Sequence, residues 1–180
     1  MPLALLGAGC GRPAPTENDV AEAGVPQKGV DRSHQGKPAP DATFNDPDGG
    51  EISLAEFRGV PVLVNLWATW CAPCVKELPT LNALSKSHAI DGRLGVIAIS
   101  QDMGPHNSVR AFLEELKVDD LGAYHDPEMA ISGALNAQAL PTTILVDGEG
   151  REVWRYVGDL DWTSEEAARL LAEAPAAAPR

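Results

Sequence analysis

The sequence is poor in cysteine, in basic residues and in long apolar runs. Cysteine occurs at three of 180 positions, and lysine and arginine number 14 against 26 aspartates and glutamates, for a formal net charge of -12. A chain this acidic repels polyphosphate, so we expect neither nucleic acid nor an anionic membrane surface among its partners. No apolar run reaches the roughly 18 residues that a helical membrane span requires.

Length and composition are those of an ordinary globular protein. A chain of 180 residues with 44% hydrophobic and 22% charged residues suits one domain with a sizeable core, and gives no compositional case for wholesale disorder. We therefore place one domain at residues 37–174 and expect it to be a monomer.

The first ten residues, MPLALLGAGC, form a short apolar stretch that ends in small residues before Cys10. This stretch resembles the end of a bacterial lipoprotein signal, whose cysteine is lipidated after cleavage. It contains no Lys or Arg and is shorter than a usual signal core, as a start codon assigned too late would explain. We expect a lipid at Cys10 to tether the protein to a membrane outside the cytoplasm. The alternative is an unstructured N-terminus with an incidental cysteine.

The segment from Gly11 to Gly36 has scattered Pro, Gly and charge without an apolar period, which indicates a flexible tether. Residues 1–36 are therefore predicted to be the end of a signal followed by this tether. The Ala- and Pro-rich tail at 175–180 is predicted to be disordered.

Turn signals and apolar periods alternate between these ends. We expect a hairpin over 42–52 with its turn at Asp46-Pro47-Asp48-Gly49, then a short helix from Ser53 to Phe57 with Glu56 completing a capping box. The other expected elements are a buried strand VLVNLWA after Pro61, a helix over 71–86, a strand over 94–99, a helix over 109–116, a short strand and a short helix within 122–135, a hairpin after Pro141, and a helix over 163–173 capped by Thr163 with Glu166. The order strand, helix, strand predicts a right-handed parallel crossover. Together these elements predict an α/β fold with a central mixed sheet and helices on both faces.

Two of the cysteines form a Cys-x-x-Cys pair between the expected strand and the expected helix. Cys71 would lie beside the unpaired N–H groups and the positive end of the helix dipole, which stabilise a thiolate and make Cys71 the attacking nucleophile. Cys74, one turn further on, would be more buried and would resolve a mixed disulfide. Pro73 suits the first helical turn, where a missing N–H costs nothing.

Metal binding and a structural disulfide are the alternatives for this pair. A structural zinc site needs four ligands, and the histidines have no finger-like spacing, so we expect no metal. Attachment of a c-type haem requires a histidine where Val75 stands. A disulfide across two residues closes too small a loop to constrain the unfolded chain much. Electron exchange is the favoured use, with no cofactor beyond the Cys71–Cys74 disulfide.

The segments VNLWATWCAPCVKELP and ALPTTILVDGEG carry a resemblance to a known family. Residues 37–174 resemble the thioredoxin fold, and specifically the TlpA/ResA-like branch of membrane-tethered thiol-disulfide oxidoreductases, whose motif is W-C-x-P-C-x-x-E-x-P. The resemblance implies a thioredoxin-like domain with an N-terminal β-hairpin extension. Its motifs are specific for fold and chemistry and less specific for the substrate.

Glu77 is the expected partner of Cys74 in proton transfer. It follows Cys74 by three residues on one helix, so the two side chains share a face, and a carboxylate there could exchange a proton with Cys74. Thioredoxins carry a buried Asp six residues before the first cysteine, but here that place holds Asn65, which cannot titrate. Periodicity alone favours a solvated glutamate beside Lys76, so both interpretations of Glu77 stay open.

Pro141 and its neighbours are the expected substrate-binding loop. Proline often opens a loop before a strand. The resemblance implies instead a cis Leu140–Pro141 bond that faces the cysteines and presents the backbone of Leu140 or Thr142 to an extended peptide. Pro73 and Trp70 are expected to contribute to the same surface.

The tryptophans are predicted to differ in role. Trp67 is expected to pack in the core, while Trp70, next to Cys71, is expected to form an apolar platform around the reactive sulfur. Trp154 and Trp162 are interpreted as packing only. In the segment Gln101–Asn107 after the second parallel strand, a surface loop is favoured over contact with a partner.

The sequence therefore predicts an extracytoplasmic or periplasmic enzyme that exchanges electrons with protein disulfides and dithiols. The resemblance implies a reducing direction, with electrons from a membrane thiol transporter and targets in cytochrome c maturation or in cytochrome oxidase copper-site assembly. Two alternatives are a copper-binding chaperone that uses Cys71, Cys74 and a histidine, and a peroxiredoxin-like peroxidase with Thr69 nearby. The spacing of the cysteines argues against both alternatives.

Overall fold

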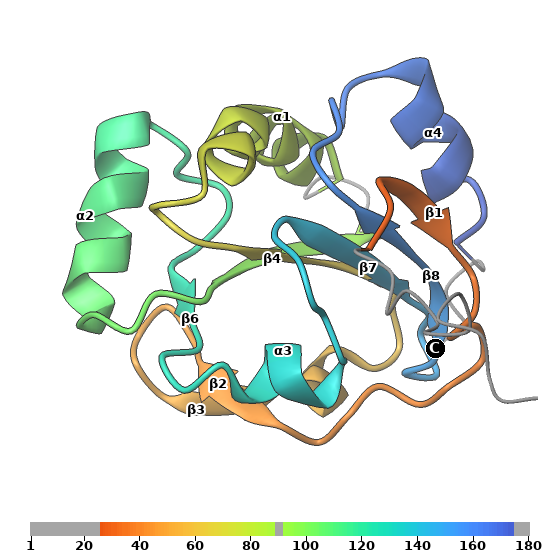
Figure 1. Ribbon diagram of the computed structural model, residues 1–180, viewed down its shortest axis with the longest axis horizontal. Helices are drawn as coiled ribbons and strands as arrows, with labels where there is room; N and C mark the ends of the chain where they lie inside the picture. Colours follow the sequence, from red (N-terminus) through yellow and green to blue (C-terminus); the bar gives the residue numbers. More distant parts are fainter. Residues whose placement is uncertain (1–25, 89–91, 175–180) are drawn as a thin grey trace, which may run out of the picture.

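A single sheet with strand order β1-β8-β7-β4-β5-β6-β2-β3 organises the chain. The computed structural model describes residues 26–88 and 92–174 (Figure 1). The strands are β1 (Gly29–Asp31), β2 (Thr43–Asn45), β3 (Glu51–Ser53), β4 (Val62–Trp67), β5 (Gly95–Ser100), β6 (Tyr124–His125), β7 (Thr142–Val146) and β8 (Glu152–Val157). The helices are the 3₁₀ helix η2 (Leu54–Phe57) and the α-helices α1 (Ala72–His88), α2 (His106–Leu116), α3 (Ala130–Ala134) and α4 (Glu165–Leu171).

The sheet is mixed and its two faces are covered, as the sequence predicts. Strand β4 pairs in parallel with β5 and antiparallel with β7, and β5 pairs in parallel with β6. Figure 1 shows α1 and α4 on one side of the central strands and α3 on the other. The thioredoxin-like fold is therefore confirmed, including the hairpin of β2 and β3 that precedes β4. In the described ranges, no helix is long and apolar enough to cross a bilayer.

Strand β4 lies between β7 and β5 at the centre of the sheet, and each of its six residues is buried. Successive side chains of a strand point to opposite faces, so Leu63 and Trp67 pack in the core under α1, while Val64 and Leu66 pack in the core on the other face. Each buried side chain of this kind contributes roughly 1.5–3 kcal/mol. The same alternation directs Asn65 to the α1 side, between two apolar neighbours.

Strand β1 lies inside the segment predicted to be a tether. Gly29 pairs with Val157 and Asp31 with Arg155 of β8, so the sheet begins before residue 37. The prediction of a tether through residue 36 is wrong for this strand, because a three-residue edge strand is held by backbone hydrogen bonds and has no apolar period. The remainder of the predicted tether up to residue 25, Cys10 and the predicted tail at 175–180 lie outside the described residues.

The last helix begins one residue later than the sequence suggests. Ser164 is its N-cap, and the Ser164 hydroxyl accepts a hydrogen bond from the Ala167 N–H. The Thr163 hydroxyl donates instead to Asp161 at 2.6 Å, so the predicted Thr163 cap with Glu166 is wrong. The predicted capping box of Ser53 and Glu56 is confirmed.

Candidate active site

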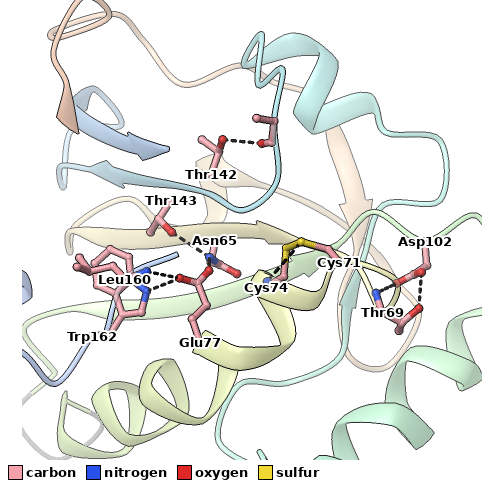
Figure 2. Close-up of a disulfide and its surroundings, with 11 residues drawn as sticks. Asn65, Thr69, Cys71, Cys74, Glu77, Asp102, Thr142, Thr143, Leu160 and Trp162 are labelled. Atoms are coloured by element: carbon pink, nitrogen blue, oxygen red, sulfur yellow. Dashed lines mark hydrogen bonds between the residues drawn. A yellow bond between two sulfur atoms is a disulfide. The ribbon is translucent and has the colours of Figure 1, made fainter. Parts of the chain in front are cut away.

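Cys71 and Cys74 are joined by a disulfide where the chain passes from β4 to α1 (Figure 2). Cys71 is 6% exposed and Cys74 is fully buried, so only the Cys71 sulfur is open to a partner. The Cys74 N–H donates to Cys71 Sγ at 3.3 Å. A backbone donor at the start of a helix stabilises negative charge on that sulfur, which favours Cys71 as the thiolate once the pair is reduced. Pro73 is exposed in the first turn of α1.

The peptide bond between Leu140 and Pro141 is cis. Thr142 pairs with Leu66 near the end of β4. Pro141 therefore lies at the same end of the central strands as the chain that leaves β4 for Cys71. The Thr142 side chain is buried and its hydroxyl donates to the Ala139 carbonyl at 2.7 Å. Thr142 can therefore offer a partner its backbone but not its hydroxyl.

The two tryptophans before the disulfide differ in exposure as predicted. Trp67 is buried, with its ring centroid 5.8 Å from that of Phe112. Trp70 is 70% exposed, which makes it an accessible apolar side chain next to Cys71 in sequence. Met103, in the loop that follows β5, is also exposed.

The loop that leads from β4 to Cys71 is fastened by Asp102. The Asp102 carboxylate accepts hydrogen bonds from the Thr69 N–H at 3.0 Å and from the Thr69 hydroxyl at 2.7 Å (Figure 2). The Ser100 hydroxyl donates to the same carboxylate at 2.7 Å, and His125 Nε2 lies 2.6 Å from the Asp102 carbonyl oxygen. Sequence reasoning missed Asp102, because its partner Thr69 is 33 positions away and neither residue carries a motif.

Glu77 is buried, at 2% exposure, on the side of α1 that faces β4. Its Oε1 accepts a hydrogen bond from Asn65 Nδ2 at 2.8 Å, and its Oε2 accepts from the Leu160 N–H at 3.0 Å and from Trp162 Nε1 at 3.2 Å. Figure 2 shows these donors surrounding the carboxylate beside the disulfide. The interpretation as a solvated glutamate beside Lys76 is therefore wrong, because periodicity did not reveal what covers this face of the helix.

Burial raises the pKa of Glu77 from 4.5 to about 7. The hydrogen bonds from Leu160, Asn65 and Trp162 oppose this rise, because they favour the charged form, and the negative charge of Asp159 adds to it. A pKa near 7 lets the carboxyl group both accept and release a proton at neutral pH. Cys74, three positions earlier in α1, is the nearest redox sulfur along the helix.

Trp162 contributes to this site although it was interpreted as packing only. Its indole stacks on Trp154 at a centroid distance of 6.5 Å, and its N–H is one of the donors to Glu77. The Trp154 N–H donates elsewhere, to the Leu170 carbonyl. An 85-residue separation between Trp162 and Glu77 leaves no local pattern from which this contact could be predicted.

The described residues do not favour the alternative sites. They contain no group of three His, Cys, Asp or Glu side chains that could hold a metal ion, so no described histidine completes a copper site with Cys71 and Cys74. Thr69, which the peroxidase alternative would use, donates its hydroxyl to Asp102. His106 begins α2, and its Nε2 lies 2.6 Å from the Ala123 carbonyl oxygen, so it has a structural partner.

A disulfide at the start of the helix that follows the central strand, with a cis proline at the same end of the neighbouring strand, defines a thioredoxin-like thiol-disulfide oxidoreductase. This enzyme class is the one that the sequence predicts. The chain belongs to the Redoxin family, whose family model matches residues 34–171.

Curated relatives agree with this class, and a solved structure agrees with the fold. The thiol-disulfide oxidoreductase ResA of Geobacillus kaustophilus is 35% identical over 137 residues, which cover 76% of this chain and 75% of that protein. ResA of Bacillus cereus is 32% identical over 124 residues, covering 69% and 70%. A Chlorobium tepidum structure, provisionally described as the thiol:disulfide interchange protein DsbE, superposes with a TM-score of 0.68 over 77% of this chain and 96% of that chain. Its 24% identity limits that comparison to the fold.

Proposed function

We propose that this thiol-disulfide oxidoreductase is a reductant of protein disulfides outside the cytoplasm. The observation that carries the exchange chemistry is the buried Glu77 carboxyl, which shares α1 with Cys74 and has a pKa of about 7. A group with this pKa can take the Cys74 proton each time the enzyme gives electrons to a target. The reducing direction is what the resemblance of the motif W-C-x-P-C-x-x-E-x-P to the TlpA/ResA-like branch implies.

The exchange proceeds in two steps. The Cys71 thiolate attacks one sulfur of a target disulfide, which forms a mixed disulfide and releases the other target sulfur as a thiolate that takes a proton from water. Glu77 then accepts the Cys74 proton, and the Cys74 thiolate attacks Cys71. The Cys71–Cys74 bond forms as the mixed disulfide breaks, so the second target sulfur leaves as a thiolate. Two electrons pass from the enzyme to the target.

The surface around Cys71 supports the binding of an extended peptide. Trp70 and Pro73, which are close to Cys71 in sequence, are exposed. The backbone of Leu140, Pro141 and Thr142 lies at the same end of the central strands. We assign these residues to substrate binding. The mode of binding is backbone pairing of the target peptide next to the cis proline, with an apolar contact to Trp70.

The proposed setting is cytochrome c maturation or the assembly of a cytochrome oxidase copper site. The targets are then the haem-site cysteines of an apocytochrome or the cysteines of a copper site, and a membrane thiol transporter supplies the electrons. A lipid at Cys10 would hold the enzyme near that transporter. The enzyme acts as a monomer, and its redox group is its own disulfide.

The reduction potential of the Cys71–Cys74 pair tests the direction. Metal-free protein is equilibrated in graded glutathione buffers, and alkylated thiols are counted by mass, with Cys10→Ser removing the third thiol. A potential near or below about -270 mV supports a reductant, whereas one near about -120 mV identifies an oxidase. A pair that does not titrate as a two-electron couple contradicts the proposed exchange.

The pH dependence of Cys74 alkylation tests the role of Glu77. In the reduced protein, Glu77→Gln is expected to remove an inflection near pH 7 from the rate profile and to slow exchange with a target peptide. Cys71→Ser together with Cys10→Ser in both backgrounds isolates the Cys74 signal. Identical profiles with Glu and with Gln would exclude Glu77 from the mechanism.

A further inference from the structure

Both donors to Glu77 Oε2 come from one segment, residues 158–162, between β8 and α4. A pocket of about 150 Å³ adjoins this segment and is lined by Lys76, Glu77, Thr80, Asp159, Leu160 and Asp161. The backbone N–H of Trp162 donates to the Thr80 hydroxyl at 3.2 Å. The environment of Glu77 therefore depends on what holds this segment and on the charges at the edge of the pocket.

Asp159 lies between two lysines from different parts of the chain. Lys28 Nζ donates to Asp159 Oδ1 at 2.7 Å, and Lys76 Nζ lies 3.5 Å from Oδ2. The hydrogen bond from Lys28 is the main reason that the pKa of Asp159 lies below its usual value. Lys28 immediately precedes β1, 131 positions from Asp159. Lys28, ahead of β1, thus reaches the segment that covers Glu77.

Gly158 allows this contact. Its φ of +94° is a conformation that side chains rarely adopt, and a Cβ atom there would lie 2.9 Å from Lys28 Cγ. The aliphatic stem of Lys28 therefore rests on the backbone at Gly158 while its ammonium group reaches Asp159.

The titratable groups around Glu77 come from several of the elements packed against it. They are Lys76 on α1, Tyr156 on β8, Asp159 and Asp161 on the 158–162 segment, Lys28 ahead of β1, and Cys74 in its reduced form. Strands β4 and β7 contribute the neutral side chains of Asn65 and Thr143. Of these charges, the Asp159 carboxylate is the one that raises the pKa of Glu77.

We propose that Lys28 is a positioning residue for Glu77 and acts through Asp159. Its ammonium group balances the Asp159 carboxylate, so the charge balance at the pocket sets how tightly Glu77 holds its proton. The consequence for the redox reaction rests on the proposed function of Glu77. Through this contact, the segment ahead of β1 is part of the machinery that prepares Cys74 for exchange.

Two substitutions should shift the titration of Glu77 in opposite directions. Lys28→Met keeps the aliphatic stem but leaves the Asp159 charge less balanced, so Glu77 should hold its proton more tightly. Asp159→Asn keeps the shape but leaves the lysines unbalanced, so Glu77 should release its proton more easily. A unit charge at a solvated pocket edge should shift the midpoint by roughly 0.3–1 pH unit, and less at high salt.

The titration is read from the ¹³C chemical shift of the Glu77 carboxyl carbon in the oxidised protein, assigned by its absence in Glu77→Gln. Lys28→Arg should restore the wild-type midpoint. Arg32→Met is the matched control, because Arg32 lies at the opposite end of β1 from Lys28 and pairs with Glu173 at 2.6 Å. This control should not move the midpoint.

The direction of the two shifts separates this proposal from simple loosening of the segment. If the ion pairs only held the backbone in place, both substitutions would withdraw the donors at Leu160 and Trp162 and raise the midpoint together. A rise with Asp159→Asn, or no shift with either substitution, overturns the proposal. If these variants leave Glu77 unmoved while Glu77→Gln still alters Cys74 alkylation, the proposed function stands without Lys28. Opposite shifts with an unaltered alkylation profile in Glu77→Gln support the action of Lys28 on Glu77 and contradict the proposed role of Glu77 in exchange.

Discussion

The side-chain amide of Asn65 on β4 donates to Glu77 Oε1 on α1 across 2.8 Å. The same Nδ2 group also lies 2.9 Å from the Thr143 hydroxyl of β7. This polar contact joins the central strand, its neighbour and the redox helix within an otherwise apolar layer. Because Asn65 cannot titrate, Glu77 is the ionisable member of this contact.

Glu77 should make stability depend on pH. Its pKa of about 7 in the folded protein exceeds its ordinary value of 4.5, so the folded state holds the proton more tightly. Below about pH 4.5 both states are protonated, and the stabilising effect is fully present. As the pH rises to 7 the unfolded state ionises first, and stability falls by on the order of 3 kcal/mol before levelling off.

Urea unfolding of the oxidised protein between pH 4.5 and 8 measures this effect. Subtracting the same series for Glu77→Gln removes the contributions of other groups. Two curves that run parallel across this pH range would show that burial does not change the proton affinity of Glu77.

Asn65→Asp should place a second carboxylate against Glu77. Two buried carboxyl groups in contact cannot both ionise without a large cost, so we expect a loss of roughly 2–4 kcal/mol at pH 8 and a smaller loss at pH 5. The double variant Asn65→Asp with Glu77→Gln should recover most of the loss, because the glutamine amide can donate to the new carboxylate. A destabilisation that is the same at both pH values argues against charge repulsion as its cause.

Trp162→Phe should remove a hydrogen bond to Glu77 while keeping a buried aromatic ring. We expect a loss of about 1–2 kcal/mol in the free energy of unfolding at neutral pH and a higher midpoint for the Glu77 carboxyl. Trp154→Phe is the matched control, since the Trp154 N–H donates to the Leu170 carbonyl. It should destabilise the protein without moving the Glu77 titration, and equal effects of both variants on the titration would contradict the contact.

Trp70→Ala should affect substrate binding and leave stability unchanged. The side chain is exposed, so the free energy of unfolding should change by no more than about 0.5 kcal/mol. The rate of exchange with a disulfide-bonded peptide should fall several-fold, while the rate with oxidised glutathione stays near that of the wild type. Equal slowing with both substrates would indicate damage to the Cys71 thiolate instead of a lost contact.

Features with a local pattern could be predicted from the sequence. The buried strand, the hairpins and the helix after Cys71 follow from apolar periods and turn residues, which act over a few positions. The difference in exposure between Trp67 and Trp70 was also predicted, because Trp67 belongs to the buried strand while Trp70 follows it, next to Cys71. The cis Leu140–Pro141 bond was implied by family resemblance and is present.

Contacts between distant segments could not be predicted from the sequence. The burial of Glu77 depends on Leu160 and Trp162, which arrive more than 80 positions later, and no spacing rule connects them to α1. Strand β1 was missed because backbone pairing holds it and its side chains follow no period. In both cases tertiary structure decides an environment that local sequence leaves undefined.

The position of β1 also constrains the order in which the sheet can form. Both outer strands, β1 and β3, precede the Cys-x-x-Cys motif in the chain, but β1 pairs with β8, the last strand to be synthesised. Strand β1 therefore has no strand to pair with until nearly the whole domain has emerged from the ribosome. Contacts this distant in sequence form slowly, and unpaired strand edges promote aggregation. Closure of β1 onto β8 is thus expected to be a late step, during which the nascent domain is most vulnerable to pairing with other chains.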